Sequence, residues 1–414
     1  MTTIGATSGL YETAVKLTSK SMQGRLSGSI GAKNAANYLA DQLNQIGYRP
    51  YPGFGSFLVP ISVFASRLTG EAKLSAGAEF FQHRTDFAEF NRVSSGGKLE
   101  GNLLVIKDGI PFDKDRLKDS IVLIQERPED FDLEGTVENA VINGVKALLI
   151  EYGEPKYFHK TVFGPRNPSI PVLKVRRSIA DKLSAADGAT IKIDLPLLNN
   201  ELPCQNVIGF LPGYKADHTI VVSAHYDHLG DDPGGFRYPG AIDNVSGVTT
   251  VLELARKLID SKLPFNIIIA FFSGEESGLN GAAQFIEQFP EPITAAINID
   301  CIGQETPISL VRVGYEAPNH WLPIAAKKVF DKSGIEIKWK EFGREDSVAF
   351  RKKGIPALGL GQFPLDNKIS IHTPDDQLDA LQFEALASWV ELTLQLITEL
   401  AEDLKGGDNH DGLH

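Results

Sequence analysis

Four short apolar runs constrain what this chain can fold into, because each has the length and composition of a strand that is covered on both faces. They are His218–Ala224, Asn266–Phe272, Ile293–Ile299 and Pro356–Leu360. Residues whose side chains can bind metal ions follow these runs in order along the chain: His225, Asp243, Glu276, Asp300 and His372. The carboxyl ends of parallel strands form one edge of a sheet, where ligands collect. The order therefore predicts that these side chains meet in a two-metal hydrolytic site.

A helical segment, Ser246–Lys262, lies between the first two runs. Its apolar Val251, Leu254 and Leu258 recur at spacings of three and four residues, as on one face of a helix. Alternation of strand, helix and strand is typical of a parallel sheet. We therefore expect an α/β fold with a mostly parallel twisted sheet flanked by helices.

Length and charge limit the functional classes. The chain has 414 residues, more than one ordinary domain, so we expect two folded units. Its formal charge of −12 argues against nucleic-acid binding. No apolar stretch approaches the roughly 20 residues of a membrane span, and the first residues have no signal-peptide pattern. We expect a cytoplasmic protein that binds neither nucleic acid nor membranes, or a secreted protein if a leader has been removed.

The cysteines and the missing motifs exclude several kinds of site. Cys204 and Cys301 are too few for a disulfide framework or a structural zinc knuckle, and we expect Cys301 to line the core. The sequence has no Gly-x-Ser-x-Gly elbow, no His-Glu-x-x-His and no Gly-rich phosphate loop. The common serine-hydrolase, single-zinc and nucleotide-binding sites are thereby excluded.

The pattern changes near Gly97, where short strands follow one another without clustered histidine or acidic residues. Strands are expected at residues 102–107, 120–125, 146–151 and 170–175, with a helix at 134–143. We interpret residues 96–198 as a small β-rich α/β insert of ordinary domain size. The interrupted catalytic domain then comprises residues 1–95 and 199–404, and residues 405–414 are expected to be a disordered tail.

Five motifs together resemble the di-zinc aminopeptidase family that is related to glutamate carboxypeptidase, transferrin receptor and glutaminyl cyclase. The motifs come in the family order: AHYDHLG (224–230), PGAIDNVSG (239–247), SGEESG (273–278), NIDCIG (298–303) and HTPDD (372–376). The segment GRLSGSIG is similar to the N-terminal part of those enzymes, and the insert resembles their protease-associated domain. The resemblance covers nearly the whole chain.

The resemblance implies a role for each site residue. One zinc ion would be bound by His225, Asp243 and Asp300, and a second by Asp243, Glu276 and His372, with Asp243 bridging them. Cobalt or manganese could replace zinc in such a ligand set.

The neighbouring carboxylates are assigned other tasks. By the same resemblance Glu275 is the general base that deprotonates a metal-bridging water. Asp227, two residues after His225, is placed to accept the other ring N–H of that imidazole. We interpret His228 as a loop residue near the metals, not as a ligand. The implied activity is a metallo-exopeptidase that hydrolyses N-terminal residues from peptides with a free N-terminus.

Three alternatives remain open. A related di-zinc carboxypeptidase would release C-terminal residues, and a single-zinc glutaminyl cyclase would need fewer ligands. A non-catalytic binding protein such as transferrin receptor keeps the fold and loses ligands, so the complete set here favours an enzyme. One departure concerns GREDSVAF (343–350), where Ser347 follows Asp346 although the family places an aromatic residue or histidine there.

Overall fold

The computed structural model describes residues 3–107, 114–126, 130–215, 217–314, 320–340, 344–362 and 371–406. These residues form two compact units. Unit 1 is built from the described residues of Met1–Val63, Leu202–Gly230 and Arg237–His414, and unit 2 from those of Phe64–Glu201 and Asp231–Phe236. Among the described residues, no helix combines the length and apolar character needed to cross a bilayer.

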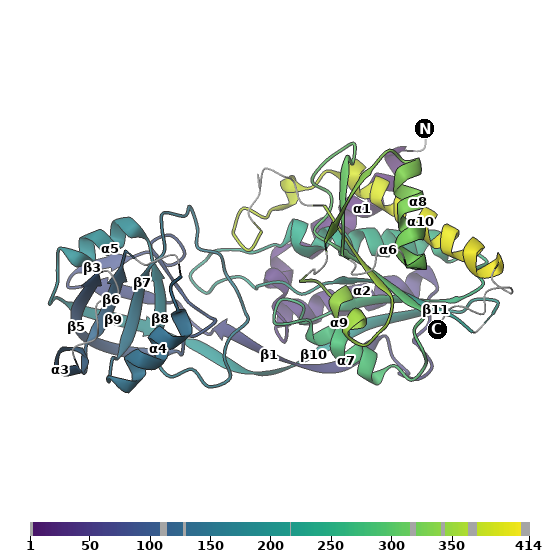
Figure 1. The fold of residues 1–414 in the computed structure, drawn as a ribbon. Coiled ribbons are helices and arrows are strands. Elements are labelled where there is room, and N and C mark those ends of the chain that lie inside the picture. Colours follow the sequence, from purple (N-terminus) through teal and green to yellow (C-terminus); the bar gives the residue numbers. More distant parts are fainter. Residues whose placement is uncertain are drawn as a thin grey trace. The chain divides into compact units, whose positions relative to one another are not determined.

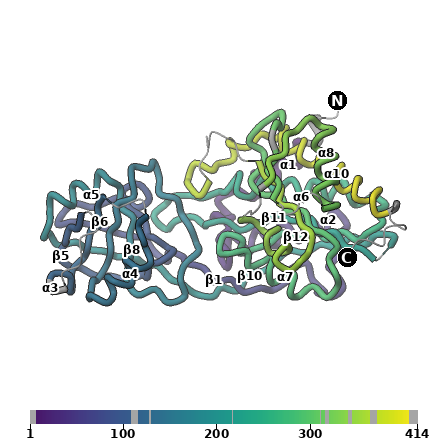
Figure 2. The backbone as a smooth tube through the Cα atoms, in the orientation of Figure 1, coloured from purple at the N-terminus to yellow at the C-terminus, as the bar shows by residue number. Residues whose placement is uncertain are grey.

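Unit 1 is organised around a mixed sheet whose central strands are parallel (Figure 1). In spatial order the strands are β1 (Leu58–Leu68), β10 (Leu197–Leu211), β12 (Asn266–Phe272), β11 (Thr219–His225), β13 (Ala295–Asp300), β16 (Ala357–Gly361), β14 (Leu310–Gly314) and β15 (Glu336–Lys340). The tube in Figure 2 follows β11 and β12 side by side, as their parallel register requires. Because β12 and β13 pair with opposite edges of β11, the strand order reverses at β11, a position where α/β proteins bind ligands.

The helices of unit 1 cover both faces of this sheet. They are α1 (Thr3–Leu17), η1 (Lys20–Arg25), α2 (Ile30–Ile46), η2 (Ala241–Val245), α6 (Ser246–Leu258), α7 (Asn280–Gln288), α8 (Trp321–Lys332), α9 (Ser347–Lys352), η3 (Leu378–Ala380) and α10 (Phe383–Gly406). Side chains of α1, α2, α6, α8 and α10 share one core cluster, and those of α7 and α9 share another.

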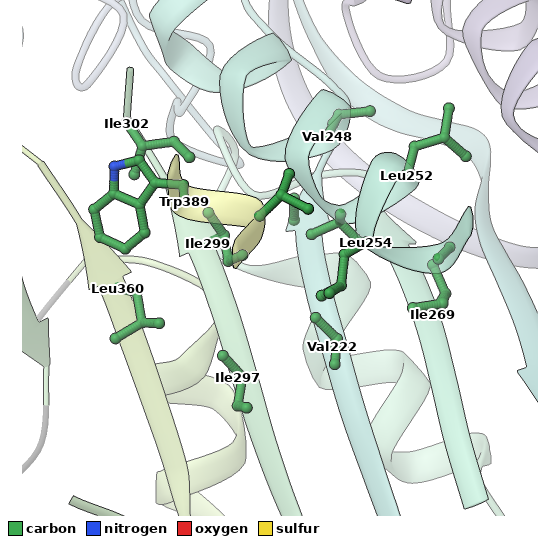
Figure 3. Packing of buried hydrophobic residues seen from close by; sticks show 14 of the residues in the cluster. Val222, Val248, Leu252, Leu254, Ile269, Ile297, Ile299, Ile302, Leu360 and Trp389 are labelled. Atoms are coloured by element: carbon green, nitrogen blue, oxygen red, sulfur yellow. The ribbon is translucent and has the colours of Figure 1, made fainter. Parts of the chain in front are cut away.

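Alternation along the strands explains the two cores. In β12, Ile267 and Ile269 join the cluster beneath α6, whereas Ile268 and Ala270 join the cluster that contains α7 and α9. Successive strand side chains point to opposite faces, so a strand between two helical layers is apolar at consecutive positions, as β12 is from Ile267 to Phe272. Figure 3 shows the first cluster, where Val222, Ile269, Ile297, Ile299 and Leu360 of the strands face Val248, Leu252 and Leu254 of α6 and Trp389 of α10.

The predicted elements of unit 1 are confirmed with small shifts. Strand β12 has the predicted bounds, whereas β11 and β13 each extend one residue further and so include His225 and Asp300. Helix α6 ends at Leu258 and not at Lys262, because the backbone N–H and the hydroxyl of Ser261 both donate to the Leu258 carbonyl oxygen. The polypeptide therefore leaves the helix one turn earlier than the apolar spacing predicts.

Unit 2 is a second α/β unit with its own cores. Its strands, in spatial order, are β3 (Glu79–Phe81), β2 (Lys73–Ala76), β9 (Thr190–Leu195), β5 (Gly97–Lys107), β6 (Ile121–Gln125), β7 (Ala147–Glu151), β8 (Val172–Val175) and β4 (Phe87–Glu89). Its helices are α3 (Lys114–Leu117), α4 (Leu133–Ile142) and α5 (Arg177–Ser184). Apolar residues of α5 and of α4 belong to separate clusters, which contain alternate residues of β6 and β7.

Unit 2 starts earlier than the insert expected at residues 96–198. Strand β2 pairs with β9 and β4 pairs with β8, so residues before Gly97 complete the sheet of this unit. Sequence patterns miss such pairings because the partners lie about a hundred residues apart. At the other end of the chain, α10 continues to Gly406, so the expected tail at 405–414 begins within a helix and otherwise lies outside the described residues.

Candidate metal centre

The predicted ligands lie at or beyond the carboxyl ends of the central strands. His225 and Asp300 are the last residues of β11 and β13, and Glu276 follows β12 in a turn. The sequence pattern implied that Asp243 follows a strand. In the structure it lies instead in η2, directly before α6. His372 lies in a turn before η3, with φ of 63°. The fold thus brings together residues separated by up to 147 positions in the sequence.

The two carboxylate oxygens of Asp243 face different groups of side chains. Oδ1 lies 3.2 Å from Nε2 of His225, and that nitrogen lies 3.4 Å from Oδ1 of Asp300. Oδ2 lies 3.0 Å from Nε2 of His372, which in turn lies 3.2 Å from Oε2 of Glu276. Each oxygen of one buried carboxylate therefore belongs to a separate group of three possible ligands.

These distances fit metal coordination. Two ligand atoms that are each 2.0–2.1 Å from a tetrahedral zinc ion lie about 3.3 Å apart. In addition, His225 Nε2 and Asp300 Oδ1 are buried atoms that have no hydrogen-bond partner. Buried polar atoms without partners are costly, and a cation between them would satisfy both.

The electrostatics of the group favour positive charge. Burial opposes protonation of His225, but the carboxylates of Glu275 and Asp300 outweigh it and raise the pKa of the ring well above its ordinary value. The pKa of His372 is raised in the same way, against burial, by Glu276 and Asp243. A divalent cation would satisfy these carboxylates in place of the protons.

Asp227 lies beside His225 but acts differently from the expectation. Nδ1 of His225 lies 3.1 Å from the backbone carbonyl oxygen of Asp227 and 3.6 Å from its carboxylate oxygen Oδ1. The backbone carbonyl is therefore the acceptor that selects the ring tautomer. The carboxylate instead accepts the backbone N–H of Glu275 at 3.3 Å, so it orients the segment that carries the expected base.

The adjacent residues Glu275 and Glu276 point to different partners. Glu276 accepts from Nδ1 of His228 at 2.7 Å and lies beside His372. Burial and the nearby charges of Glu276 and Asp300 raise the pKa of Glu275 well above its ordinary value, although His225 opposes the shift. Burial opposes the ionisation of Glu276, but the charge of His372 and the hydrogen bonds with His228 and His372 lower its pKa to about 2. One carboxylate is thus disposed to hold a proton and its neighbour to remain ionised.

His228 lies beside the predicted ligand Glu276, which agrees with its interpretation as a loop residue near the metals. Its Nδ1 bonds to Glu276, its Nε2 is buried without a hydrogen-bond partner, and one of its ring nitrogens could hold a metal ion together with Asp243 and Glu276. The sequence carried a signal for this residue, because it lies three positions after His225 within AHYDHLG.

Two further residues hold Asp243 in place. The carboxylate of Asp376 accepts the backbone N–H groups of Ile242 and Asp243 at 2.7 and 3.1 Å. The side chain of Asn244 donates to the Ile299 carbonyl at 3.0 Å and accepts from Gly247 N–H at 2.9 Å. Both residues lie in the sequence motifs PGAIDNVSG and HTPDD, but a motif does not reveal which backbone atoms a side chain reaches.

Cys301 also lies near the centre, in a group with Asp243 and Asp300 that could hold a metal ion. Its side chain is buried, as expected of a residue that lines the core. Burial and the adjacent carboxylates raise the pKa of its thiol well above the ordinary value. The thiolate form that binds metals is therefore disfavoured.

Sequence comparison identifies the family. A model of peptidase family M28 matches residues 206–397, which contain the five predicted ligands and Glu275. Residues 206–397 belong to peptidase family M28. M28 proteins are peptidases, so this part of the chain belongs to a hydrolase family.

Relatives and solved structures agree with the M28 assignment. A probable leucine aminopeptidase of Trichophyton verrucosum (strain HKI 0517) is 29% identical over 236 residues, which cover 52% of this chain and 62% of that protein. Aminopeptidase YwaD of Bacillus subtilis (strain 168) is 25% identical over 319 residues, covering 72% of this chain and 66% of that protein. The chain therefore spans less than two thirds of the length of either relative. The crystal structure of BSAP, a zinc aminopeptidase from Bacillus subtilis, has a TM-score of 0.74 at 22% identity and 95% coverage of both chains, which confirms the fold.

Ser347, where the resemblance implies an aromatic residue or histidine, is bonded to Glu345. Ser347 donates its backbone N–H and its hydroxyl to Glu345, at 2.7 and 2.5 Å, and Glu345 also accepts from the Asn298 side chain at 2.9 Å. Both carboxylate oxygens of Asp346 are buried without a hydrogen-bond partner. Burial raises the pKa of Asp346 well above its ordinary value, so its neutral form is favoured. Gly343 of this segment lies outside the described residues.

Proposed function

We propose that this chain is a zinc-dependent aminopeptidase that binds two metal ions and removes N-terminal residues from peptides. The observation that carries the proposal is the division of Asp243, whose two oxygens face His225 and His372 separately at 3.2 and 3.0 Å. A carboxylate in this position is suited to bridge two ions, as in two-metal hydrolases. The names of the relatives, which include aminopeptidases and a zinc aminopeptidase, support the same activity.

The ligand roles follow from the two groups of atoms. His225, Asp243 and Asp300 would hold one ion, and Asp243, Glu276 and His372 the other. Zinc supplies Lewis acidity when bound, which polarises a substrate carbonyl and makes water more acidic. Imidazole and carboxylate ligands also accept cobalt or manganese, so the ion bound depends on availability.

Glu275 is suited to move the proton. Its raised pKa makes it a stronger base than an exposed glutamate, and its backbone is held by the carboxylate of Asp227. We assign to Glu275 the removal of a proton from the attacking water and its delivery to the leaving amine. Glu276, whose pKa is lowered to about 2, stays ionised as a ligand.

The free α-amine of the substrate would be recognised by charge. The centre gathers the carboxylates of Asp243, Glu275, Glu276 and Asp300, whose negative charge would offset that of two divalent ions. An ammonium or amine group can donate hydrogen bonds to such oxygens, whereas an acetylated amine has lost its charge and gained bulk. The carboxylates therefore favour release from the amino end of a peptide.

A pair of matched substrates tests the proposal. Leucyl anilide and N-acetyl-leucyl anilide differ only at the amine, and we expect turnover of the free compound and almost none of the acetylated one. Equal rates on both would reject the aminopeptidase while leaving a metal centre in place. Release of C-terminal residues from a peptide that is blocked at its amine would identify the carboxypeptidase alternative.

The single-zinc cyclase alternative is disfavoured by the second group of ligands. A cyclase with one ion would leave one of the two groups of three possible ligands without a metal to bind. Incubating a peptide with N-terminal glutamine and following ammonia release by mass spectrometry distinguishes cyclisation from hydrolysis. A product that is lighter than the intact peptide by about 17 Da, the mass of one ammonia molecule, would support the cyclase instead.

A further inference from the structure

Arg25 is a buried arginine that donates hydrogen bonds to four backbone carbonyl groups. Its Nε donates to Tyr226 O at 2.8 Å, and its Nη1 donates to Leu17 O at 2.9 Å and to Pro239 O at 2.6 Å. Its Nη2 donates to Gly240 O at 3.1 Å. The residue is 1% exposed, so its side chain is enclosed by these groups.

Three of the four carbonyl groups that Arg25 binds, those of Tyr226, Pro239 and Gly240, lie near two metal-ligand positions in the sequence. Tyr226 directly follows His225, and Gly240 lies three residues before Asp243. One planar guanidinium group therefore cross-links the segments that carry these two ligands. His225 Nε2 and Asp243 Oδ1 lie 3.2 Å apart, a spacing that depends on the relative position of the two segments.

The backbone on either side of Arg25 continues the contact. Gly24 O accepts from Gly230 N–H at 2.8 Å, Arg25 O accepts from His228 N–H at 3.2 Å, and Leu26 forms a parallel bridge with His228. Arg25 itself has φ of 51°, a left-handed conformation that is costly for a residue with a side chain. The hydrogen bonds of its side chain and backbone hold this conformation in place.

Ser27 extends the same segment to the base. Its hydroxyl donates to Asp227 Oδ2 at 3.0 Å and lies 2.9 Å from the hydroxyl of Ser273. The other carboxylate oxygen of Asp227 accepts the backbone N–H of Glu275. Residues 24–27 therefore contact the segment after His225, the segment before Asp243 and the carboxylate that orients Glu275.

We infer that Arg25 is a positioning residue that sets the affinity of the centre for metal, with Ser27 supporting Asp227 and Glu275. The inference rests on the proposed function. Arg25 and Ser27 both lie outside residues 206–397, the part of the chain that matches the M28 model. Arginine suits the task because its rigid planar fork can bind several carbonyl groups in fixed directions, whereas the lysine ammonium is a single point of charge. The four carbonyl groups that Arg25 binds belong to Leu17, Tyr226, Pro239 and Gly240, none of which is a predicted ligand, so these bonds act on the placement of the ligands.

A lysine substitution tests the inference while preserving charge. We expect Arg25→Lys to weaken zinc binding by ~10–100-fold, the usual effect of removing a group that orients ligands. Zinc affinity is measured by competition with a chelating indicator, at a temperature where circular dichroism shows the metal-free variant to be folded. Arg256→Lys is the matched control, since Arg256 lies in α6 and binds Glu253 and Gln42, away from the ligand segments.

Chemical rescue separates positioning from simple loss of packing. In Arg25→Ala, added methylguanidinium in the millimolar range should restore zinc affinity, and methylammonium at equal concentration should not.

Ser27→Ala removes only a hydroxyl and should fold even where the Arg25 variants do not. It should lower kcat by ~10-fold or more with KM nearly unchanged, because its effect reaches Glu275 through Asp227.

The outcomes are distinguishable from failure of the proposed function. A wild-type protein that binds no zinc, or that does not hydrolyse leucyl anilide, would overturn the proposed function itself. Wild-type protein that binds zinc and is active, together with an Arg25→Lys variant of normal zinc affinity, would overturn the inference alone. If neither Arg25 variant folds, normal kcat in Ser27→Ala overturns the inference and a reduced kcat supports it.

Discussion

The ring nitrogen Nδ1 of His225 lies 3.1 Å from the backbone carbonyl oxygen of Asp227 and 3.6 Å from Oδ1 of its carboxylate. The side-chain identity at position 227 is therefore less important for the imidazole tautomer than the path of the backbone. The carboxylate serves Glu275 instead, through the backbone N–H of that residue.

Substitution of Asp227 tests this division of labour. Asp227→Asn keeps the backbone carbonyl, so the His225 tautomer should be unchanged and the zinc affinity should fall by less than ~10-fold. The kcat should fall by a larger factor than the zinc affinity, because the backbone N–H of Glu275 loses a charged acceptor. Nitrogen NMR shifts of the imidazole report the tautomer, and chelator competition reports the affinity. A changed tautomer with unchanged kcat would show that the carboxylate serves the imidazole after all.

Asp243 should control both metal ions. Asp243→Asn keeps the shape of the side chain but removes the charge that two ions would share, so the content of both should fall below the two equivalents expected of the wild type. Elemental analysis after dialysis measures this directly. Asp260→Asn, at an exposed position beyond α6, is the control. A wild type that is fully active with one equivalent would contradict the two-ion site.

The adjacent glutamates should separate into base and ligand. Glu275→Gln should retain metal and lose turnover by ~10²–10⁴-fold, the usual contribution of a general base. Glu276→Gln should lose metal from the group that contains His372. Metal content and kcat of the two variants are measured in parallel, and a Glu275→Gln variant with near-normal turnover would reverse the assignment.

Asp376 should influence metal binding without contacting metal. It accepts the backbone N–H groups of Ile242 and Asp243, and an asparagine has only one oxygen with which to replace that pair. Asp376→Asn should therefore weaken zinc binding by about 10-fold, with the neighbouring exposed Asp375→Asn as its control. Equal zinc affinity in both variants would show that the η2 backbone is held by other contacts.

Unit 2 should lose stability in acid because of Glu89. Burial opposes ionisation of this carboxyl, but Arg84 at 2.5 Å and His83 at 2.8 Å lower its pKa to about 2. A lowered folded-state pKa adds stability above the unfolded value near 4.5, and this stability, roughly 3 kcal/mol, is lost as the pH falls toward 2.

Hydrogen exchange can measure that loss. The opening free energy of β4 and β8 amides, corrected for intrinsic exchange rates, should fall between pH 5 and 2 in the wild type. Glu89→Gln should be less stable at neutral pH and show a flatter pH dependence. Glu134→Gln, which breaks an exposed pair with Arg92, should behave as the wild type. Parallel pH curves for Glu89→Gln and the wild type would contradict the assignment.

The sequence by itself determined the strands, the order of the ligand residues and the α/β class. These features are local, because a short run such as Asn266–Phe272, which is apolar at every position after the first, is typical of a strand covered on both faces, and here its predicted bounds are those of β12. Metal-binding residue types at the ends of such runs are visible in the same way. The M28 match to residues 206–397 agrees with this part of the interpretation.

Only the tertiary structure decided which atoms meet. The division of the Asp243 oxygens, the use of the Asp227 carbonyl in place of its carboxylate, and the bonds of Arg25 all depend on rotamers and on segments up to 215 residues apart. The predicted insert lacked β2, β3 and β4, which belong to unit 2 in the structure. The sequence did not show this, because strand pairing joins distant residues. Spacing along a chain specifies the direction of a side chain within one helix or strand, but contacts between elements form only when the whole fold has packed.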